Sequence, residues 1–316
     1  MSLLINILYA AINYGAPLML GTTGEILSEK AGNLNLGVEG MMWMGAFAGF
    51  YTAYKADSLI LALIVAFTVS ASCALIYAIL TVTLRANQNV VGLAITTFGI
   101  GLAKVFGESM VRNASGASVA LSGKLDKTLS PVEIPFLSDI PIIGKLLFNY
   151  NILIYLSVLI CIVIAFYLKR TRMGLNLRAV GENPSAADAA GISVNKIKYI
   201  NIVLGGGLCG IGGAYMSLVT ANGLWMQSGI VNGFGWISVA LVIFATWKPI
   251  KAILGAFLFG FFTVLQFYPI ISVPTAIYQM LPFLLTTIVL IISSVRKRRE
   301  GIQPESCGVN YFREER

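Results

Sequence analysis

Polar side chains that could bind a solute interrupt the apolar sequence at residues 24–40. This segment joins two apolar stretches and carries five acidic or amide side chains: Glu25, Glu29, Asn33, Asn35 and Glu39. Charged and amide groups at membrane depth are costly and usually face a cavity or a partner. The glycines of the segment would allow a broken or re-entrant backbone, whose freed polar groups can line a solute path. A cytoplasmic hairpin loop with a solvated face is the alternative, and the residues alone support both interpretations equally.

Two further polar sets could line the same path. One lies near the start of the fourth apolar stretch and the other follows the sixth: Gln88, Asn89, Thr96 and Thr97, then Asn222, Trp225, Gln227 and Asn232. Their hydroxyls, amides and aromatic ring would suit a ribose and a base. For each residue taken alone, a polar cap at a helix end or an interfacial Trp is the more common role.

Groups for catalysis or metal binding are scarce. The sequence has no His, the commonest general base and metal ligand, and its four Cys lack the spacing of a metal site. It contains no GxxxxGK[ST] phosphate loop, because Asp139 and Leu146 flank Gly144-Lys145 where Gly and Ser or Thr are needed. We therefore expect no catalytic residue, no metal and no cofactor in this chain, which is not expected to be an enzyme.

The composition indicates an integral membrane protein. Of the 316 residues, 57% are hydrophobic and 11% are charged, against about 25% charged in soluble domains. A membrane span needs about 20 mostly apolar residues. Nine stretches are candidates, at roughly 3–21, 36–54, 58–80, 89–108, 151–168, 198–219, 233–247, 250–268 and 275–294. The glycines of 205–213, inside the sixth stretch, predict close helix packing.

The predicted fold is therefore an all-α polytopic membrane protein with about nine transmembrane helices and broken or re-entrant segments. A transmembrane domain would cover residues 1–295, followed by a cytoplasmic tail at 296–316. Most of the 22 Lys and Arg fall on one side when the loop at about 169–197 and the tail are cytoplasmic.

That arrangement predicts an N-terminus outside and a C-terminus in the cytoplasm. The long segment at about 109–150 would form an ordered outer cap or a partner-docking surface. Because the basic residues lie next to apolar stretches, the net charge of +8 indicates membrane lipid, and not nucleic acid, as the partner.

The basic loop contains a short segment with the signals of a capped helix. Asn183 can cap its N-terminus, Pro184 suits the first helical position, and Gly191 suits a left-handed stop. Small alanines fill the space between them. A small helix on the basic side of a membrane protein can seat in a groove of another protein. An ordinary loop helix is the alternative.

The segment Glu182-Asn-Pro-Ser-Ala-Ala-Asp-Ala-Ala-Gly-Ile192 resembles the coupling loop of permease subunits in ABC importers of the branched-chain amino acid, simple-sugar and nucleoside group. Residues 25–42 are similar to the signature of nucleoside and simple-sugar permeases that pair with a basic-membrane-protein-type binding lipoprotein. The similarity resumes at Arg85-Ala-Asn-Gln-Asn-Val-Val-Gly92 and at Gly308-Val-Asn-Tyr-Phe-Arg-Glu-Glu-Arg316.

The resemblance implies a permease subunit that forms the translocation path for nucleosides, with purine nucleosides as the narrower candidate. It implies a separate cytoplasmic ABC ATPase that binds the ATP, and a second permease subunit, either a longer paralogue or a copy of this chain. It also implies an extracellular or periplasmic nucleoside-binding lipoprotein and the cell membrane of a prokaryote. The coupling residues that it implies are Glu182, Asn183, Pro184, Ser185, Ala186, Ala187, Asp188 and Gly191.

Three other functions stay open at this level. A simple-sugar permease of the same importer group, for a sugar such as ribose or galactose, would carry the same coupling loop. An ion-coupled secondary carrier would need no ATPase and would leave that loop unexplained. A membrane-embedded enzyme has the least support, because no nucleophile or metal constellation stands out.

Overall fold

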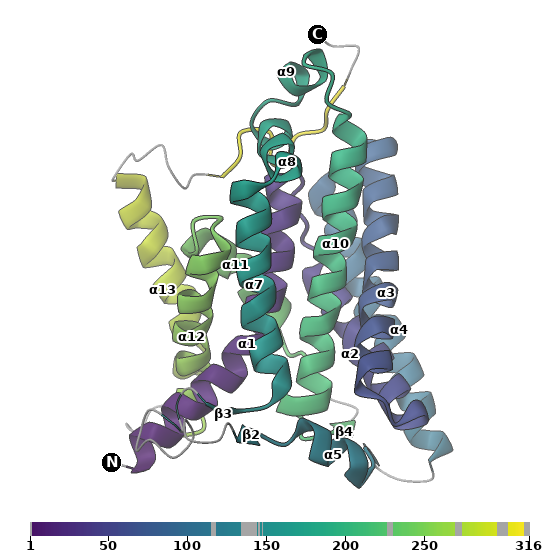
Figure 1. Cartoon of the computed structure of the whole chain (residues 1–316), viewed down its shortest axis with the longest axis vertical. Helices are drawn as coiled ribbons and strands as arrows, with labels where there is room; N and C mark the ends of the chain where they lie inside the picture. The colour runs from purple at the N-terminus through teal and green to yellow at the C-terminus, as the bar shows by residue number, and fades with distance from the viewer. Residues whose placement is uncertain are drawn as a thin grey trace.

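The computed structural model describes residues 2–114, 118–133, 144, 146, 148–225, 230–268, 274–295 and 303–312. They form an elongated helical bundle (Figure 1). Its helices are α1 (Ser2–Lys30), α2 (Val38–Ala56), α3 (Leu59–Ala78), α4 (Gln88–Asn113), α5 (Gly123–Leu129), α7 (Ile152–Arg170), α8 (Arg172–Glu182), α9 (Pro184–Ala189), α10 (Val194–Tyr215), α11 (Phe234–Phe244), α12 (Pro249–Leu265) and α13 (Thr275–Val295). Two π-helical turns, η1 (Ile79–Thr83) and η2 (Met216–Thr220), extend α3 and α10.

Apolar helices long enough to cross a membrane make up much of the bundle. Five segments of the described chain meet that condition by length and composition: Leu3–Lys30, Leu59–Thr83, Gln88–Asn113, Ile152–Arg170 and Val194–Thr220. Three shorter apolar helices accompany them, at Phe234–Phe244, Pro249–Leu265 and Ala276–Ile288. The predicted all-α membrane class is therefore confirmed, whereas the count of nine spans stays a prediction.

The first helix is longer than the sequence predicts. An end near residue 21 was expected from the apolar run, but α1 continues to Lys30. Residues 31–37, which we call the link, then form a mostly buried non-helical connection to α2. Gly40 near the start of α2 packs against Ile95 and Thr96, two turns into α4. The link therefore enters the bundle and is not the solvated face of a hairpin.

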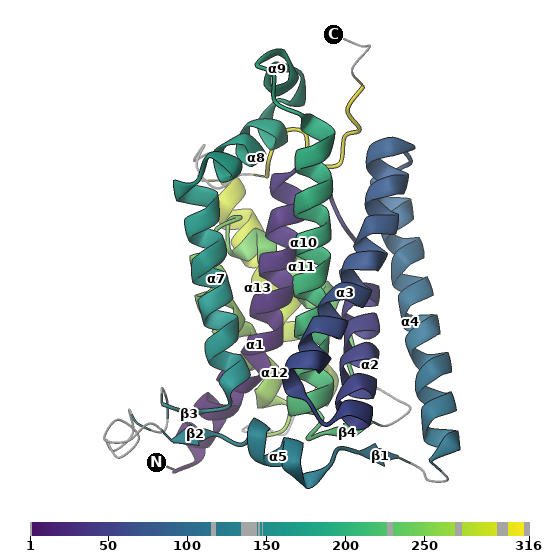
Figure 2. The ribbon, with the colours of Figure 1, turned by 45° about the vertical axis from the view of Figure 1, so that its right-hand side comes forward.

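Glycines allow the central helices α1, α2 and α10 to approach one another closely. A Cβ atom on Gly45 of α2 would lie 2.3 Å from the carbonyl oxygen of Gly210 in α10. A Cβ atom on Gly205 would lie 2.4 Å from the carbonyl oxygen of Gly24 in α1. Figure 2 shows α1 and α10 side by side at the centre of the bundle. The predicted close packing of residues 205–213 is confirmed.

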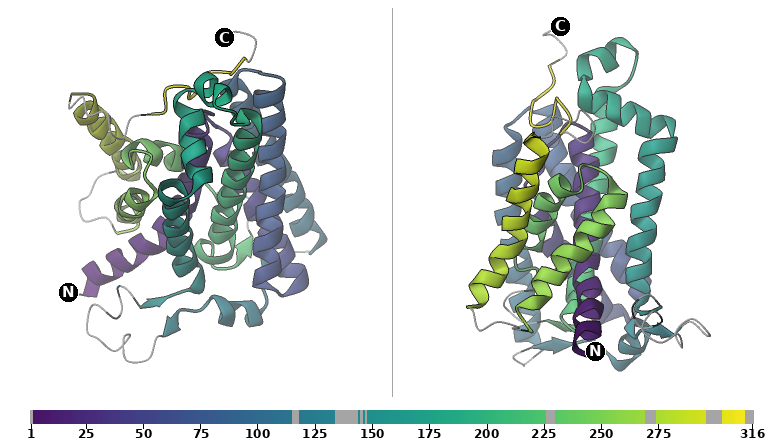
Figure 3. Two further views of the ribbon diagram at one scale, coloured as in Figure 1. Left: turned by 45° about the horizontal axis from the view of Figure 1, so that its top comes forward. Right: turned by 90° about the vertical axis from the view of Figure 1, so that its left-hand side faces the viewer.

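The two ends of the bundle carry different structures (Figure 3). At one end, the cap end, α5 lies across the helices beside two pairs of short antiparallel strands. The pairs are β1 (Val119–Ala120) with β4 (Leu224–Trp225), and β2 (Val132–Glu133) with β3 (Asn149–Tyr150). At the other end, the loop end, α8 and α9 lie near residues 303–312. The described part of the predicted cap at 109–150 is thus ordered, and it lies at the end where α1 begins.

Candidate functional site

The capped helix predicted in the basic loop is present at the loop end as α9. The side-chain oxygen of Asn183 accepts a hydrogen bond from the backbone N–H of Ala186 at 2.9 Å, and Pro184 lies in the first turn. The helix ends at Ala189, and Gly191 follows with a φ of +81°, in the left-handed region that favours Gly. The local signals read from the sequence are therefore confirmed.

Helix α9 divides its small side chains between the interior and the surface. Ala187 is only 4% exposed and belongs to an apolar cluster with Val180 and Ile197. A partner protein therefore cannot contact the Ala187 methyl group, which anchors the helix to the bundle. Of the other predicted coupling residues, Glu182, Asn183, Ser185, Ala186 and Gly191 are exposed, and Pro184 and Asp188 are half-buried.

Residues 303–312, which we call the strap, hold α8 and α9 in place. The hydroxyl of Tyr311 donates a hydrogen bond to the carboxylate of Asp188 in α9 at 2.8 Å. The backbone N–H and the hydroxyl of Ser306 both donate to the carbonyl oxygen of Gly181 in α8, at 3.0 and 2.6 Å. The described part of the predicted tail therefore lies against α8 and α9.

The strap also contacts the turn between η1 and α4. The side-chain amide of Asn310 donates to the carbonyl oxygens of Arg85 and Ala86, at 2.6 and 3.1 Å. The amide of Gln88 donates to the side-chain oxygen of Asn310 at 3.2 Å, and the Arg85 guanidinium lies 4.7 Å from the centre of the Phe312 ring. The strap thus connects α9 with the start of α4, a role that the sequence did not reveal.

Several candidate path residues hold the buried link through hydrogen bonds. The backbone N–H of Asn35 donates to the carboxylate of Glu25 at 2.9 Å, and that of Leu34 donates to the side-chain oxygen of Gln88 at 2.8 Å. The Asn33 amide donates to a hydroxyl of η1 at 3.4 Å. Non-helical backbone is tolerated at membrane depth where protein groups satisfy it. These side chains therefore stabilise the break between α1 and α2.

Glu39 binds the N-terminus of α11. Its carboxylate accepts hydrogen bonds from the backbone N–H groups of Gly233 at 3.0 Å and Gly235 at 2.7 Å. The indole N–H of Trp43 donates to the same carboxylate at 3.1 Å. The first N–H groups of a helix lack intrahelical partners and attract negative charge. Glu39 therefore caps a helix from across the bundle.

The remaining candidate path residues differ in exposure. Thr96 is buried and donates to a carbonyl oxygen of the link at 2.7 Å. Trp225 is 2% exposed in β4, and its ring packs against Phe47 and Phe50. The exposed candidates are Asn89, Thr97, Asn222 and Asn232. Gln227 lies outside the described residues. The structure thus gathers Asn33, Asn35, Gln88 and Thr96 around the link and places the others elsewhere.

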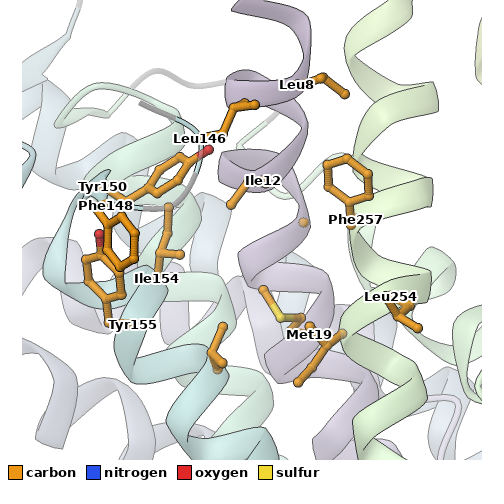
Figure 4. A pocket seen from close by; sticks show the side chains of 13 residues that line it. Leu8, Ile12, Met19, Leu146, Phe148, Tyr150, Ile154, Tyr155, Leu254 and Phe257 are labelled. Atoms are coloured by element: carbon orange, nitrogen blue, oxygen red, sulfur yellow. The ribbon is translucent and has the colours of Figure 1, made fainter. Parts of the chain in front are cut away.

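An apolar cavity of about 650 Å³ opens between α1, α7 and α12 (Figure 4). Ile12 and Met19 of α1, Ile154 of α7 and Phe257 of α12 face it, and its oxygen atoms come from tyrosine hydroxyls and backbone. Burying a hydroxyl-rich solute among such groups would leave its polar atoms without partners. This cavity suits hydrocarbon and not a sugar or nucleoside.

Comparisons with known proteins point to one class of transport subunit. Residues 7–290 match the family described as branched-chain amino acid transport system / permease component. A chain named as a glucose ABC transporter permease of Haloferax volcanii is 37% identical over 266 residues, covering 84% of this chain and 78% of the relative. No solved structure matches this chain.

Two further relatives match over more of their length. A nucleoside ABC transporter permease of Lactococcus lactis is 33% identical, covering 95% of this chain and 94% of the relative. A guanosine ABC transporter permease of Bacillus subtilis is 32% identical, covering 97% of this chain and 96% of the relative. The resemblance noted from the sequence motifs is confirmed.

Proposed function

Because this chain belongs to the family of permease components of branched-chain amino acid transport systems, we propose that it forms half of the path for nucleosides in an ABC importer. It is a multi-pass membrane protein and a non-catalytic transport subunit. The observation that carries the substrate class is its similarity, over nearly the whole chain, to permeases named for nucleosides and guanosine. Purine nucleosides are the narrower candidate.

Helix α9 would couple this path to a separate cytoplasmic ABC ATPase that binds and hydrolyses ATP. The exposed side chains of Ser185 and Ala186 are small, and both ends of the helix are capped, so the helix can enter a groove as a rigid body. The loop end would then face the cytoplasm of a prokaryotic cell. The cap end, with the N-terminus, would face the extracellular or periplasmic nucleoside-binding lipoprotein.

A second permease subunit would cover the outward face of α4. Thr97, Lys104 and Glu108 lie on that face at helical spacing, and all three are exposed in this chain. Charged side chains inside membrane helices face a bundle interior or a water-filled cavity and rarely lipid. A longer paralogue or a second copy of this chain would place these groups, together with Asn89, along a wet path between two subunits.

The candidate path residues then take two roles. The exposed side chains of Asn89, Thr97 and Asn222 are free to contact a passing solute. Buried candidates act on the path indirectly, because their polar atoms hold backbone in place: Asn33, Asn35, Glu39, Gln88 and Thr96. Trp225 fastens the cap.

A simple sugar is the second candidate substrate, since the relative from Haloferax volcanii is named for glucose. Uptake of radiolabelled guanosine and glucose by the same complex would separate the two. An ion-coupled secondary carrier has no comparable support, because the relatives are named as ABC transporter permeases.

Placing a bulky side chain on the exposed face of α9 tests the coupling role. Ser185→Trp adds volume that a packed groove can accept only with strain, so the ATPase should no longer co-purify and ATP-dependent guanosine uptake should fall at least tenfold. Thr68→Trp, on the exposed face of α3, is the matched control and should transport normally. Normal ATPase binding and uptake with Ser185→Trp would remove α9 from the coupling role.

A further inference from the structure

A second cavity, of about 690 Å³, lies at the cap end. Tyr9, Asn13 and Tyr14 line it from one face of α1, while the apolar cavity lies on another face of the same helix. The opposite wall comes from η2 and the turn after it, and Tyr268 closes one side. Its volume falls in the range of about 300–1,000 Å³ that small-molecule sites occupy.

A chain of hydrogen bonds fixes one wall of this cavity. The Tyr215 hydroxyl donates to the side-chain oxygen of Asn13 at 3.3 Å, and the Asn151 amide donates to the Tyr215 oxygen at 3.4 Å. The side-chain oxygen of Asn151 accepts from the backbone N–H groups of Leu153 and Ile154 at the start of α7. Hydrogen bonds within the protein therefore preorganise this wall in the absence of a solute.

Two polar groups of the opposite wall have no such partners. The Thr220 hydroxyl oxygen is buried and has no hydrogen-bond partner among the described residues. The Asn222 side chain is exposed, and its amide hydrogen-bonds to none of the other described residues. A buried hydroxyl without a partner is costly, and such groups in native structures usually have a ligand, a water or a functional role to explain them.

We propose that this cavity is an outer binding site for a nucleoside, where the solute rests before it enters the membrane path. The proposal rests on the function proposed above and names a place for its substrate. Tyrosine rings supply faces on which a base can stack, and the exposed Asn222 amide can pair with a base edge or a ribose hydroxyl. The Thr220 hydroxyl, which lies inside the wall, would join them after a rotation about χ1 that turns it toward the cavity.

The charge of the lining selects against other substrates. Among the described residues that line this cavity, none is Lys, Arg, Asp or Glu. An amino acid carries two charges and a nucleotide carries a phosphate, and neither would find a counter-charge here. A neutral solute with a flat ring and several hydroxyls is the ligand class that fits, which favours a nucleoside over a branched-chain amino acid.

Direct binding of tritiated guanosine tests the site without transport. The complete importer membrane complex would be purified into nanodiscs without its binding protein, and the Kd for guanosine measured at equilibrium. Thr220→Val removes the hydroxyl at nearly constant shape. Asn222→Gly removes the amide and suits the backbone, because Asn222 has a φ of +52°. Each should raise the Kd about tenfold, the effect of one lost hydrogen bond.

Controls separate a lost contact from a damaged protein. Thr68→Val removes a hydroxyl that donates to its own helix at 3.0 Å on the exposed face of α3, and it should leave the Kd unchanged. All variants should unfold at the wild-type temperature. Glucose in hundredfold excess should not displace guanosine from the wild-type complex.

Three outcomes would overturn the site. They are no saturable guanosine binding to the wild type at millimolar concentration, a wild-type Kd in both variants, and displacement of guanosine by equimolar glucose. The first two would leave the importer assignment standing if guanosine uptake with the binding protein still fell in the Ser185→Trp variant. Normal guanosine uptake in Ser185→Trp would instead overturn the proposed function.

Discussion

Glu39 shows what a carboxylate at membrane depth can do other than bind a solute. The sequence marks it as a polar residue at the edge of an apolar run, which predicts a path or a partner. Its partners are backbone N–H groups of Gly233 and Gly235, which lie 194 and 196 residues further along the chain. No local pattern contains that pairing. The sequence therefore leaves Glu39 open between a solvated loop residue and a group inside the bundle, and the fold shows that it is buried and which groups it binds.

Removal of the Glu39 carboxylate should destabilise the protein as well as slow transport. In Glu39→Ala, the N–H groups of Gly233 and Gly235 would lose their acceptors, at about 1–3 kcal/mol for each buried donor. Glu39→Gln keeps one acceptor oxygen and should lose less. The unfolding temperature in detergent measures the difference between the variants. Glu108→Ala, at an exposed position, is the control. An unchanged unfolding temperature for Glu39→Ala would show that it does not secure α11.

At the scale of elements, α9 and the strap differ in how far the sequence reveals them. The caps of α9 involve residues within one turn of each other, so their identities predict the helix and its ends. The strap depends on Tyr311 meeting Asp188 and on Asn310 meeting Arg85, across 123 and 225 residues. Its residues carry no periodic or capping signal. The structure alone shows that residues 303–312 hold α9.

Cys307 in the strap gives a direct measure of strap docking. Burial raises the pKa of Cys307 to about 12, so the thiol stays protonated at pH 8 and reacts slowly with maleimide. A released strap would restore an ordinary pKa of about 8.5 and a faster reaction. Because the shift is upward, the docked thiol should react faster only as the pH rises toward 12. The other three Cys are buried in membrane helices.

Asn310→Ala should release the strap, because it removes the donors to Arg85 and Ala86. We expect maleimide labelling of Cys307 at pH 8, measured by mass spectrometry, to rise several-fold. Val309→Ala is the neighbouring control, since the Val309 side chain is 61% exposed. Equal labelling of Cys307 in the wild type and in Asn310→Ala would mean that these hydrogen bonds do not hold the strap.

At the scale of the whole molecule, the hydropathy pattern places the helices well and their ends less well. The predicted stretches 58–80 and 151–168 correspond closely to α3 and α7. The predicted end of the first stretch is wrong by more than two turns, because Glu25 and Glu29 interrupt the apolar run while the helix continues. Both side chains are buried, where Asn35 and Trp247 donate hydrogen bonds to them. A hydropathy scale treats these carboxylates as exposed to water. In the folded protein they are buried, because groups from distant parts of the chain donate hydrogen bonds to them.

The orientation of the molecule across the membrane is a prediction from its basic residues, and it can be tested at the two ends of the bundle. Lys127 is exposed on α5 at the cap end, and Ser185 is exposed on α9 at the loop end. In a Cys307→Ser background, Lys127→Cys should react with a membrane-impermeant maleimide in intact cells, because basic residues concentrate inside and the cap end is predicted to lie outside. Ser185→Cys should react only after the membrane is permeabilised. Labelling of Ser185→Cys from outside, with Lys127→Cys protected, would invert the topology, and an ATPase in the cytoplasm could then not reach α9.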